Sequence, residues 1–545
     1  MQLYQLPSDI WDHISSYLLI DSITTILSTS TRMYMRKVYI THFIDRKGSG
    51  TNFRKSFMEN GLVPILELFP NLSSINVSYR LIVPASEILI FLKSLPPTMK
   101  SLTMKYVSLE PRLDARLEEK TNADMVSIND YFANSTLEFI DIDFPIVEYP
   151  RNIKSASIRY HEGIHLAETL TNLNLLSYVY DENMVLPPDL TRLTLRCRHS
   201  VDSRLPEMPH GLQFLEISYY GTHLDISALK SCKNLRTLRF TEAGFILNSG
   251  NSSFLPPNLE YLKCTFAAGE GVTILSRLPQ RIPHIKEFSP DATTFLNNES
   301  FRIITDFKDL QVLSIFNNKM LTDSFIYIVP RSLKRLTLGY CENLTTNICA
   351  GLPSTLEHFG TNIVVDDTVF GILPQTLSSL ILTSCKNRST KISGAQNLPP
   401  NLFTLTLFYS KRVKLSTDYI YNLPRYIRNL NLKMIEDRPS KVSRGTLFKY
   451  LPPYLSKFVY SYSGVIEQSP DDVKVLPKSI TILDLGGYED SDEIITLRKR
   501  IHRYLPNLIE FNHTGVDLCG DEFEPLPYRN YNNIEMIREH VPLDQ

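Results

Sequence analysis

Residues 161–165 of the sequence read His-Glu-Gly-Ile-His. On a helix, two histidines four residues apart share a face and bind zinc, and the glutamate beside the first one activates the metal-bound water for hydrolysis. Such a site also needs a third ligand and a substrate cleft, and nothing downstream supplies a recognisable signature for either. Gly163, in the middle of the motif, lowers its helix propensity. The surrounding elements therefore decide whether the motif does chemistry.

Other catalytic signatures are missing from the sequence. It contains no G-x-x-x-x-G-K-S/T phosphate loop and no G-x-S-x-G elbow. The seven cysteines, an odd number without a C-x-x-C pair, suit a reducing compartment better than a disulfide framework. They also follow the repeats described below, which favours a packing role over metal ligation. We expect a chain without catalytic activity, metal or cofactor.

Composition excludes several classes of partner and location. The 545 residues include 57 basic and 58 acidic side chains, a net charge of −1, which argues against a bulk electrostatic partner such as nucleic acid. The N-terminal stretch MQLYQLPSDIWDH lacks the basic start and apolar core of a signal peptide. Apolar runs such as ILIFL at 88–92 are too short to span a bilayer. We expect a soluble protein of the cytoplasm or nucleus that does not bind membranes.

One phrase recurs through most of the chain, as LPPDLTRLTL at 186–195, LPPNLEYLKC at 255–264 and LPPNLFTLTL at 398–407. Its core is L-x-x-L-x-L, and we call the first apolar residue of each copy the index residue. From Leu190 onward the index residues are 21 to 28 residues apart, whereas earlier spacings are irregular. The index residues are Leu72, Met99, Leu137, Ile153, Leu173, Leu190, Leu212, Leu235, Leu259, Ile282, Leu310, Leu333, Leu356, Leu377, Leu402, Ile427, Leu455, Ile480 and Leu508.

This period resembles the leucine-rich repeat. In such a repeat the apolar positions bracket a short strand and point inward, and each unit buries its apolar side on the next. The proline ahead of the phrase fits a chain that is turning into the sheet. The resemblance implies an α/β fold: a solenoid over 71–519 with a curved parallel sheet and a helical or irregular convex side. We expect 46–70 to be a linker or N-terminal cap and 520–545 to be a C-terminal cap or tail.

A second feature of the repeat lies eight residues after the index residue, at a position we call the turn slot. Asn318, Cys341 and Cys385 occupy it, and leucine-rich repeats use Asn or Cys there to hydrogen-bond the turning backbone. These units resemble the cysteine-containing subclass, and the recurrent L-P-x-x-L-x-x-L-x-L phrase also resembles FNIP-type repeats. Counted from Ile153, His161 falls in the turn slot. We therefore interpret the histidine motif as the turn and outer helix of one repeat, with His161 capping the backbone.

The first 45 residues follow a different pattern. Apolar residues recur at helical spacing in three short segments, and so few residues can hardly bury them among themselves. The order L-P-x-D-I, then Ile14, Leu18, Asp21 and a polar-basic stretch at 30–32 resembles an F-box. The tryptophan that the family carries near its third helix is replaced by Met33 or Tyr34. The resemblance implies docking on a Skp-family adaptor through Leu6, Pro7, Ile10, Ile14, Leu18, Ile23, Ile26 and Met33.

An F-box followed by leucine-rich repeats implies the substrate-recognition subunit of an SCF-type (Skp–cullin–F-box) E3 ubiquitin ligase, joined through the adaptor to a cullin–RING ligase and holding a target protein of unknown identity. The alternative is a leucine-rich-repeat scaffold without a ligase role, whose first helices serve as a cap. Basic and aromatic residues at or near outward strand positions suit a protein-binding hot spot. These candidate target-binding residues are Arg159, Arg196, Arg239, Lys263, Phe316, Arg335, Tyr340, Phe408 and Lys433.

Overall fold

The computed structural model describes residues 42–45 and, with gaps, 73–514. The gaps are 78–80, 105–106, 110–114, 162–163, 180, 182–183, 198–202, 220–223, 242–245, 267–269, 292–295, 364–366, 384–390, 393, 410–413, 416–419, 436–447, 464–469, 489–500, 502 and 509. Residues 1–41, which hold the predicted adaptor-binding residues, lie outside the described residues. The chain forms two compact units, Met1–Ile285 and Lys286–Gln545, and each is described by itself.

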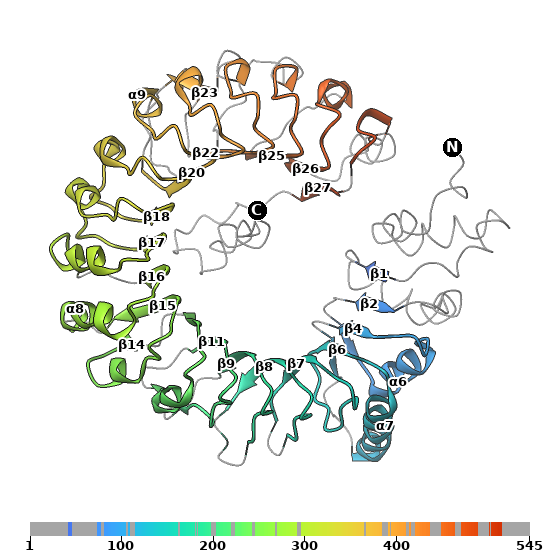
Figure 1. Ribbon diagram of the computed structural model, residues 1–545. Coiled ribbons are helices and arrows are strands. Elements are labelled where there is room, and N and C mark those ends of the chain that lie inside the picture. Colours follow the sequence, from blue (N-terminus) through green and yellow to red (C-terminus); the bar gives the residue numbers. More distant parts are fainter. Residues whose placement is uncertain are drawn as a thin grey trace. The chain divides into compact units, whose positions relative to one another are not determined.

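The first unit is built on parallel strands that pair in the order of the sequence, one strand per repeat (Figure 1). Its strands are β1 (His42–Asp45), β2 (Ser74–Val77), β4 (Ser101–Met104), β6 (Phe139–Ile142), β7 (Ser155–Arg159), β8 (Asn172–Tyr178), β9 (Arg192–Cys197), β11 (Phe214–Ser218), β13 (Thr237–Thr241) and β15 (Tyr261–Phe266). β1 lies at the end of the range 1–45 that we predicted to be helical.

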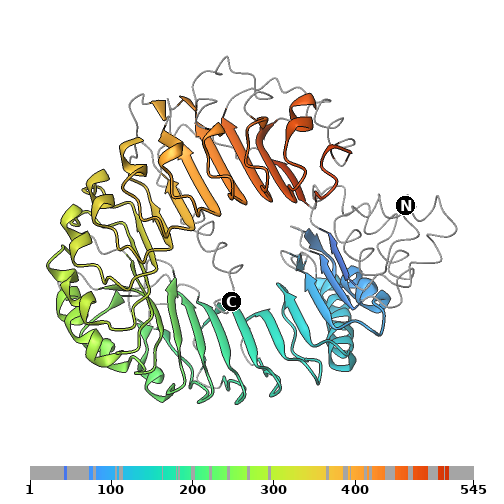
Figure 2. The ribbon, with the colours of Figure 1, turned by 45° about the horizontal axis from the view of Figure 1, so that its top comes forward.

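The second unit repeats this construction (Figure 2). Its strands are β16 (Glu287–Asp291), β17 (Val312–Phe316), β18 (Arg335–Gly339), β19 (His358–Thr361), β20 (Ser379–Thr383), β22 (Thr404–Tyr409), β24 (Asn429–Ile435), β25 (Lys457–Ser463), β26 (Ile482–Tyr488) and β27 (Glu510–Thr514). Sequential strands in parallel register, one to a repeat, are the architecture of a solenoid. The prediction of a leucine-rich-repeat solenoid with a parallel sheet is therefore confirmed for the described residues.

The leucines of the repeat form the core because strand side chains alternate between two faces. In β9 the side chains of Leu193 and Leu195 are fully buried, as is the index residue Leu190. Leu193 lies opposite Leu173 on one side and Leu215 on the other, so neighbouring repeats bury the same positions against one another. Each fully buried leucine contributes about 2 kcal/mol through the hydrophobic effect. No single repeat can achieve this burial alone.

The register corrects two of the index residues. Asn172 of β8 pairs with Arg192 of β9, which makes Leu170 the equivalent of Leu190, so Leu173 is wrong as an index residue. Glu287 of β16 pairs with Val312 of β17, which makes Ile285 the index residue in place of Ile282. In both repeats an apolar pair three residues apart fits the start of the phrase in two ways. The buried residues Leu170 and Ile285 lie two residues before the strands observed, as the index residues of the other repeats do.

In many repeats a proline precedes the strand at a specific position. In repeats of both units it lies three residues before the index residue, and its carbonyl accepts the N–H of that residue: Pro187 O from Leu190 N at 3.2 Å and Pro353 O from Leu356 N at 3.1 Å. Proline, which has no backbone N–H, fits the start of this turn because no donor is required at that position. The start of the proline-led phrase is thus a tight turn, and the index residue at its end packs in the core.

The residue just before the index residue ties neighbouring repeats together. Thr169 Oγ1 donates to the carbonyl of Ile153 at 2.7 Å, and Thr376 Oγ1 donates to that of Leu356 at 2.7 Å. Asparagine plays the same part in other repeats: Asn258 Nδ2 donates to Lys233 O at 2.8 Å. Each bond satisfies a carbonyl at the start of the preceding strand, where the sheet ladder has not yet begun. The repeat frame is therefore the same in both units.

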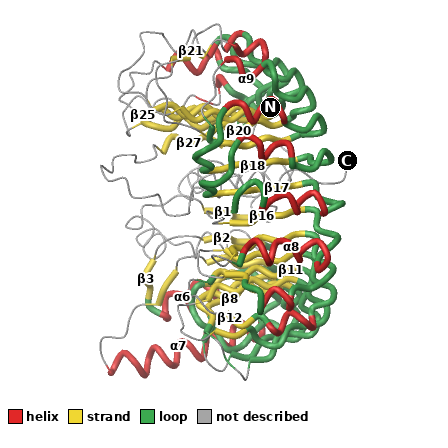
Figure 3. The backbone as a smooth tube through the Cα atoms, turned by 90° about the vertical axis from the view of Figure 1, so that its left-hand side faces the viewer, coloured by secondary structure: helices red, strands yellow, loops and turns green. Residues whose placement is uncertain are grey.

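The segments that return from one strand to the next hold α-helices, 3-10 turns, short strands or none of these (Figure 3). The α-helices are α6 (Ala85–Ser94), α7 (Ala115–Asn134), α8 (Gly271–Arg281) and α9 (Asp367–Phe370). The 3-10 turns are η3 (Ser227–Ser231), η4 (Asn251–Phe254), η5 (Ser300–Asp306), η6 (Asp323–Tyr327), η7 (Thr346–Gly351), η8 (Gly394–Asn397) and η9 (Pro470–Val475). No helix in the described part of the chain has both the length and the apolar composition to cross a membrane.

Short strands pair outside the main rows. They are β3 (Leu81–Val83) with β5 (Val107–Leu109), β10 (Ser203–Arg204) with β12 (Leu224–Asp225), and β21 (Lys391–Ile392) with β23 (Lys414–Leu415). β14 (Ile246–Leu247) extends the pairing of β15. All of these pairs are parallel and join neighbouring repeats, so they continue the stacking beyond the main strands.

Candidate functional site

The described residues of the histidine motif, His161, Ile164 and His165, do not form a helical metal site. His161 lies two residues after the end of β7, and the residues described from Ile164 to Leu170 contain no helix, so the predicted outer helix is absent there. The ring Nε2 of His161 makes a 2.8 Å hydrogen bond with the carbonyl of Ile146 in the preceding repeat, whereas His165 is exposed. The described residues contain no group of three His, Cys, Asp or Glu able to hold a metal ion. His161 is therefore a turn-slot residue that binds the backbone, as predicted.

Asn318 shows the turn slot in its complete form. Its side chain is fully buried, and its Nδ2 donates to Leu296 O of the preceding repeat at 2.9 Å. Its Oδ1 accepts from the backbone N–H groups of Met320 and Leu321, both at 2.8 Å. Asn317, just before the slot, has φ of 54°, a left-handed conformation that turns the chain out of the strand. The predicted role of Asn318 is confirmed.

The cysteines of the described residues line the repeat interior. Cys264 takes the last apolar position of its phrase with no exposed surface, and Cys341 takes the turn slot with 5% exposed. Burial raises the pKa of the Cys341 thiol to about 11 and that of Cys197 to about 12. Protonated, enclosed thiols behave as small apolar side chains. Cys385 and Cys519 lie outside the described residues.

A cluster of aromatic and charged side chains occupies the outward face of the sheet in the first unit. We call it the stacked cluster and define it as Arg192, Phe214, Glu216, Arg239 and Tyr261. The Arg192 guanidinium carbon lies 3.6 Å from the centre of the Phe214 ring. That of Arg239 lies 4.7 Å from the Tyr261 ring centre and 5.5 Å from the Phe214 ring centre. Arg239 Nη1 is also 3.7 Å from Glu216 Oε2.

The local fold explains the cluster. Arg192, Phe214 and Tyr261 all lie two residues after their index residues, and Glu216 and Arg239 two residues further on. The register sets Phe214 beside Arg192 and Glu216 beside Arg239 on adjacent strands. Parallel strands about 4.8 Å apart bring these side chains into contact distance. Guanidinium groups held over aromatic rings gain about 0.5–1 kcal/mol or more from the cation–π interaction.

Of the predicted target-binding residues in the first unit, only Arg239 belongs to the stacked cluster. Lys263 pairs in register with Arg239 on the neighbouring strand, so it lies beside the cluster. Arg159 and Arg196 occupy the carboxyl ends of β7 and β9, with β8 between them. Sequence reasoning missed Arg192, Phe214 and Tyr261. Their residue types, together with their common distance of two residues from the index residue, are the sequence signal that could have found them.

The structure does not gather the predicted residues of the second unit into one cluster. Phe316 covers Gly339 of the next strand, and Tyr340 follows β18 in a left-handed conformation with 55% of its surface exposed. Arg335 lies beside His358, and burial together with this positive charge lowers the pKa of the imidazole to about 4. Phe408 pairs in register with Lys433, whose side chain lies outside the described residues.

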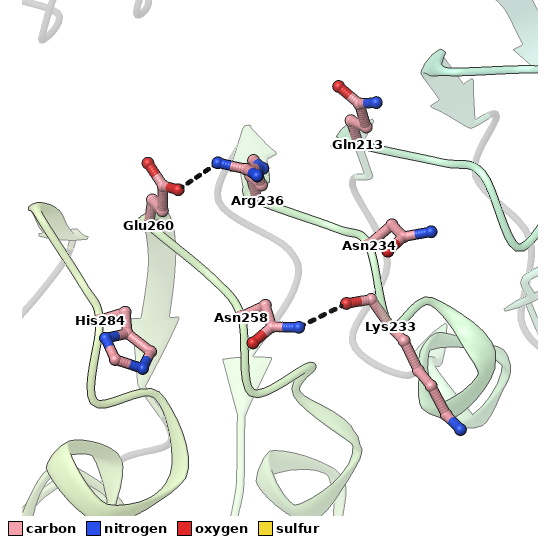
Figure 4. A pocket seen from close by; sticks show the side chains of 7 residues that line it. All are labelled: Gln213, Lys233, Asn234, Arg236, Asn258, Glu260 and His284. Atoms are coloured by element: carbon pink, nitrogen blue, oxygen red, sulfur yellow. Dashed lines mark hydrogen bonds and ion pairs between the residues drawn. The ribbon is translucent and has the colours of Figure 1, made fainter.

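A polar hollow of about 360 Å³ lies at the amino ends of the strands in the first unit (Figure 4). Arg236 Nη1 and Glu260 Oε1 form a 2.7 Å ion pair across it, and Asn258 braces the backbone at Lys233. These bonds connect neighbouring repeats, so the hollow belongs to the repeat frame. The side chains that line it are Gln213, Lys233, Asn234, Arg236, Asn258, Glu260 and His284.

Comparison with known proteins adds a fold likeness alone. No family model and no curated protein matches the chain. Among solved structures, one chain of the "Crystal structure of TLR13-ssRNA13 complex" is similar to this chain, with 15% identity and a TM-score of 0.42. The match covers 82% of this chain and 71% of that one. A likeness this distant has no bearing on what this chain binds. Fold and site together define a leucine-rich-repeat solenoid with an aromatic and charged sheet face.

Proposed function

We propose that this chain is the substrate-recognition subunit of an SCF-type E3 ubiquitin ligase, with the repeats holding a target protein. The observation that carries the target-binding half is the stacked cluster. Arginine and aromatic side chains on an open sheet face are the residue types that dominate protein-binding hot spots. The chain itself performs no covalent step. It raises the local concentration of target lysines near the ubiquitin-loaded enzyme.

The adaptor-binding half of the proposal is supported by the sequence pattern of the first 41 residues. The LPSDI start and the spacing of Ile10, Ile14 and Leu18 predict a short helix with apolar residues on one face. An apolar helical face of this kind marks a protein interface. The adaptor-binding residues Leu6, Pro7, Ile10, Ile14, Leu18, Ile23, Ile26 and Met33 all lie outside the described residues and stay a prediction.

A repeat scaffold without a ligase role is the second candidate. The stacked cluster favours it to the same degree, because Arg192, Phe214 and Arg239 belong to the repeats and require nothing from residues 1–41. In this alternative the chain holds a partner protein and the first helices cover the end of the solenoid. The two candidates therefore differ only in whether an adaptor binds.

Capture of the adaptor separates the two candidates. The full chain, expressed with Skp-family proteins and purified by a tag, is expected to retain the adaptor in a stoichiometric complex. A triple variant Pro7→Ala/Ile10→Asp/Ile14→Asp is expected to lose the adaptor while its far-UV circular dichroism stays that of the wild type. The matched control replaces three exposed apolar residues of the repeats, Val126→Asp/Val185→Asp/Val272→Asp, whose exposures of 60%, 80% and 51% make them tolerant. Absence of any adaptor from the wild-type complex would leave the scaffold role alone.

A further inference from the structure

The sheet face from β7 to β15 is basic, although the whole chain is almost neutral and the preceding strand β6 carries the outward Asp141. The six main strands β7, β8, β9, β11, β13 and β15 present three outward positions each, and these positions hold five basic side chains and one acidic one. All other outward residues on these strands are uncharged. The charged ones are Arg159, Arg192, Arg196, Glu216, Arg239 and Lys263. A ligand of complementary charge is therefore negative.

The arginines are arranged to bind carboxylates. The guanidinium carbons of Arg192 and Arg239 lie 3.6 Å and 4.7 Å from the ring centres of Phe214 and Tyr261, so contact with the rings restrains both side chains. A guanidinium carries its N–H donors around its edge, in the fork geometry that matches the two oxygens of a carboxylate. Within the chain, Glu216 Oε2 lies 3.7 Å from Arg239 Nη1, an ion pair that is longer than a direct hydrogen bond. The face thus offers oriented donors in addition to positive charge.

The same stacking disfavours single-stranded nucleic acid as the ligand. Recognition of nucleic acid strands relies on open aromatic faces on which bases stack. Here the Phe214 ring carries Arg192, and Tyr261 is 94% buried beside Arg239. The arginines therefore occupy the places that bases would take. Carboxylates need only the guanidinium edges.

We propose that the sheet face of β7 to β15 binds an extended acidic segment of a partner protein, whose Asp and Glu side chains pair with Arg159, Arg192, Arg196, Arg239 and Lys263. This inference rests on the proposed function in one respect, because it names the class of target segment that the repeats take. Six strands about 4.8 Å apart span roughly 24 Å. An extended segment of about seven or eight residues covers that distance.

A direct binding measurement tests this surface. The probe is a fluorescein-labelled ten-residue peptide of alternating Glu and Ser, titrated with the full chain and read by fluorescence anisotropy. Arg192→Gln/Arg239→Gln is expected to weaken binding at least tenfold. The matched control Lys230→Gln/Arg277→Gln makes the same charge change at exposed residues of η3 and α8, away from the sheet face, and is expected to change affinity less than twofold. Arg192→Lys/Arg239→Lys keeps the charge but loses the fork and is expected to fall between them.

Three outcomes would overturn the proposal. One is no saturable binding of the acidic peptide, a second is equal weakening by the control variant, and a third is tighter binding of a ten-nucleotide oligouridine than of the peptide. Adaptor capture by the same preparations keeps this test distinct from the proposed function. A chain that holds the adaptor but not the peptide retains the ligase role and loses the acidic-segment surface. A chain that binds the peptide but no adaptor is a scaffold with this surface.

Discussion

The two units are built from the same kind of repeat but differ in the side chains at the outward positions of their strands. Proline-led turns, braces before the index residue and buried leucines recur in both. The outward positions of β7 to β15 hold five basic side chains and one acidic one, whereas the described outward side chains from β16 to β26 hold two of each sign: Glu287, Arg335, Lys457 and Asp484. Threonine, serine and asparagine fill many of the other outward positions in both units, such as Ser157 and Thr194 in the first and Ser314 and Thr337 in the second.

This difference between the units shows that packing restricts the side chains at inward strand positions but not those at outward positions. Inward positions contact the neighbouring repeats and are restricted to apolar side chains of suitable volume. Outward positions contact only the strands beside them, so their chemistry is set by cross-strand neighbours and by ligands. The small polar side chains of the second unit fit this surface without forming a cation–π cluster. The large charged and aromatic ones of the first unit hold one another in place, which is the arrangement of a preorganised binding surface.

The turn slots give the sharpest comparison between the units. Asn318→Ala is expected to lower the free energy of unfolding by about 4 kcal/mol, because it leaves two backbone N–H groups and one carbonyl without partners in a buried site. His161→Ala in the first unit removes one hydrogen bond from a partly buried site and is expected to cost about 1 kcal/mol. Urea denaturation followed by far-UV circular dichroism measures both. Equal losses would mean that the two slots do not differ in this way.

The sheet face of the second unit is expected to make stability depend on pH. His358 has its pKa lowered from 6.5 to about 4 by burial and by Arg335. The unfolded chain therefore binds this proton at a higher pH than the folded chain does. Above about pH 6.5 His358 is neutral in both states and does not lower the free energy of unfolding. As the pH falls from 6.5 toward 4, protonation of the unfolded chain lowers this free energy by about 3 kcal/mol.

Denaturation midpoints at pH values between 4 and 7 test this dependence. His358→Gln is expected to flatten the curve over this window, since the variant has no group to protonate at that place. His284→Gln, the same substitution at an exposed histidine of the first unit, serves as the control and should leave the slope of the wild type in place. A wild-type slope that survives in His358→Gln would assign the dependence to another group.

The aromatic side chain of the second unit's face packs differently from those of the stacked cluster. A Cβ at Gly339 would overlap the Phe316 ring, so Gly339→Ala forces the ring to move. We expect a loss of about 2 kcal/mol from this overpacking. In Phe316→Leu/Gly339→Ala the obstacle is gone and the cost of the alanine should fall below about 1 kcal/mol. Ser218→Ala, at the matching strand position of β11, is expected to change stability by about 0.5 kcal/mol or less.

The sequence predicts the repeats and most of their strands because the spacing of apolar residues follows the positions that become buried. L-x-x-L-x-L marks three inward positions, and the turn slot, eight residues on, identified both Asn318 and His161 from a count alone. In two repeats the sequence pattern alone predicts an index residue three residues out of register, Leu173 and Ile282. The reason is that each repeat holds two apolar residues three apart, and either one can start the phrase. Strand pairing resolves the choice, since it shows which residues lie side by side.

The stacked cluster could be read from the sequence only in part. Arg239 was found as an outward basic residue, but its contacts with Phe214 and Tyr261 cross from one repeat to the next. Such contacts depend on the register and on side-chain direction, which a single repeat does not encode. The adaptor-binding residues between Leu6 and Met33 lie outside the described residues, and their role stays a prediction.

The smallest expected effect concerns the one acidic side chain on the basic face. Glu216 pairs with Arg239 at 3.7 Å, and both side chains are 26% exposed, so the pair contributes only about 0.5 kcal/mol to stability. Because this carboxylate competes with an acidic ligand for the same guanidinium, Glu216→Gln is expected to tighten binding of the Glu-Ser peptide about two- to threefold. Glu260→Gln changes the charge equally but lies before β15 and pairs with Arg236, so it should leave the affinity unchanged. Tightening by both variants to the same extent would indicate a response to net charge alone, without a site at Arg239.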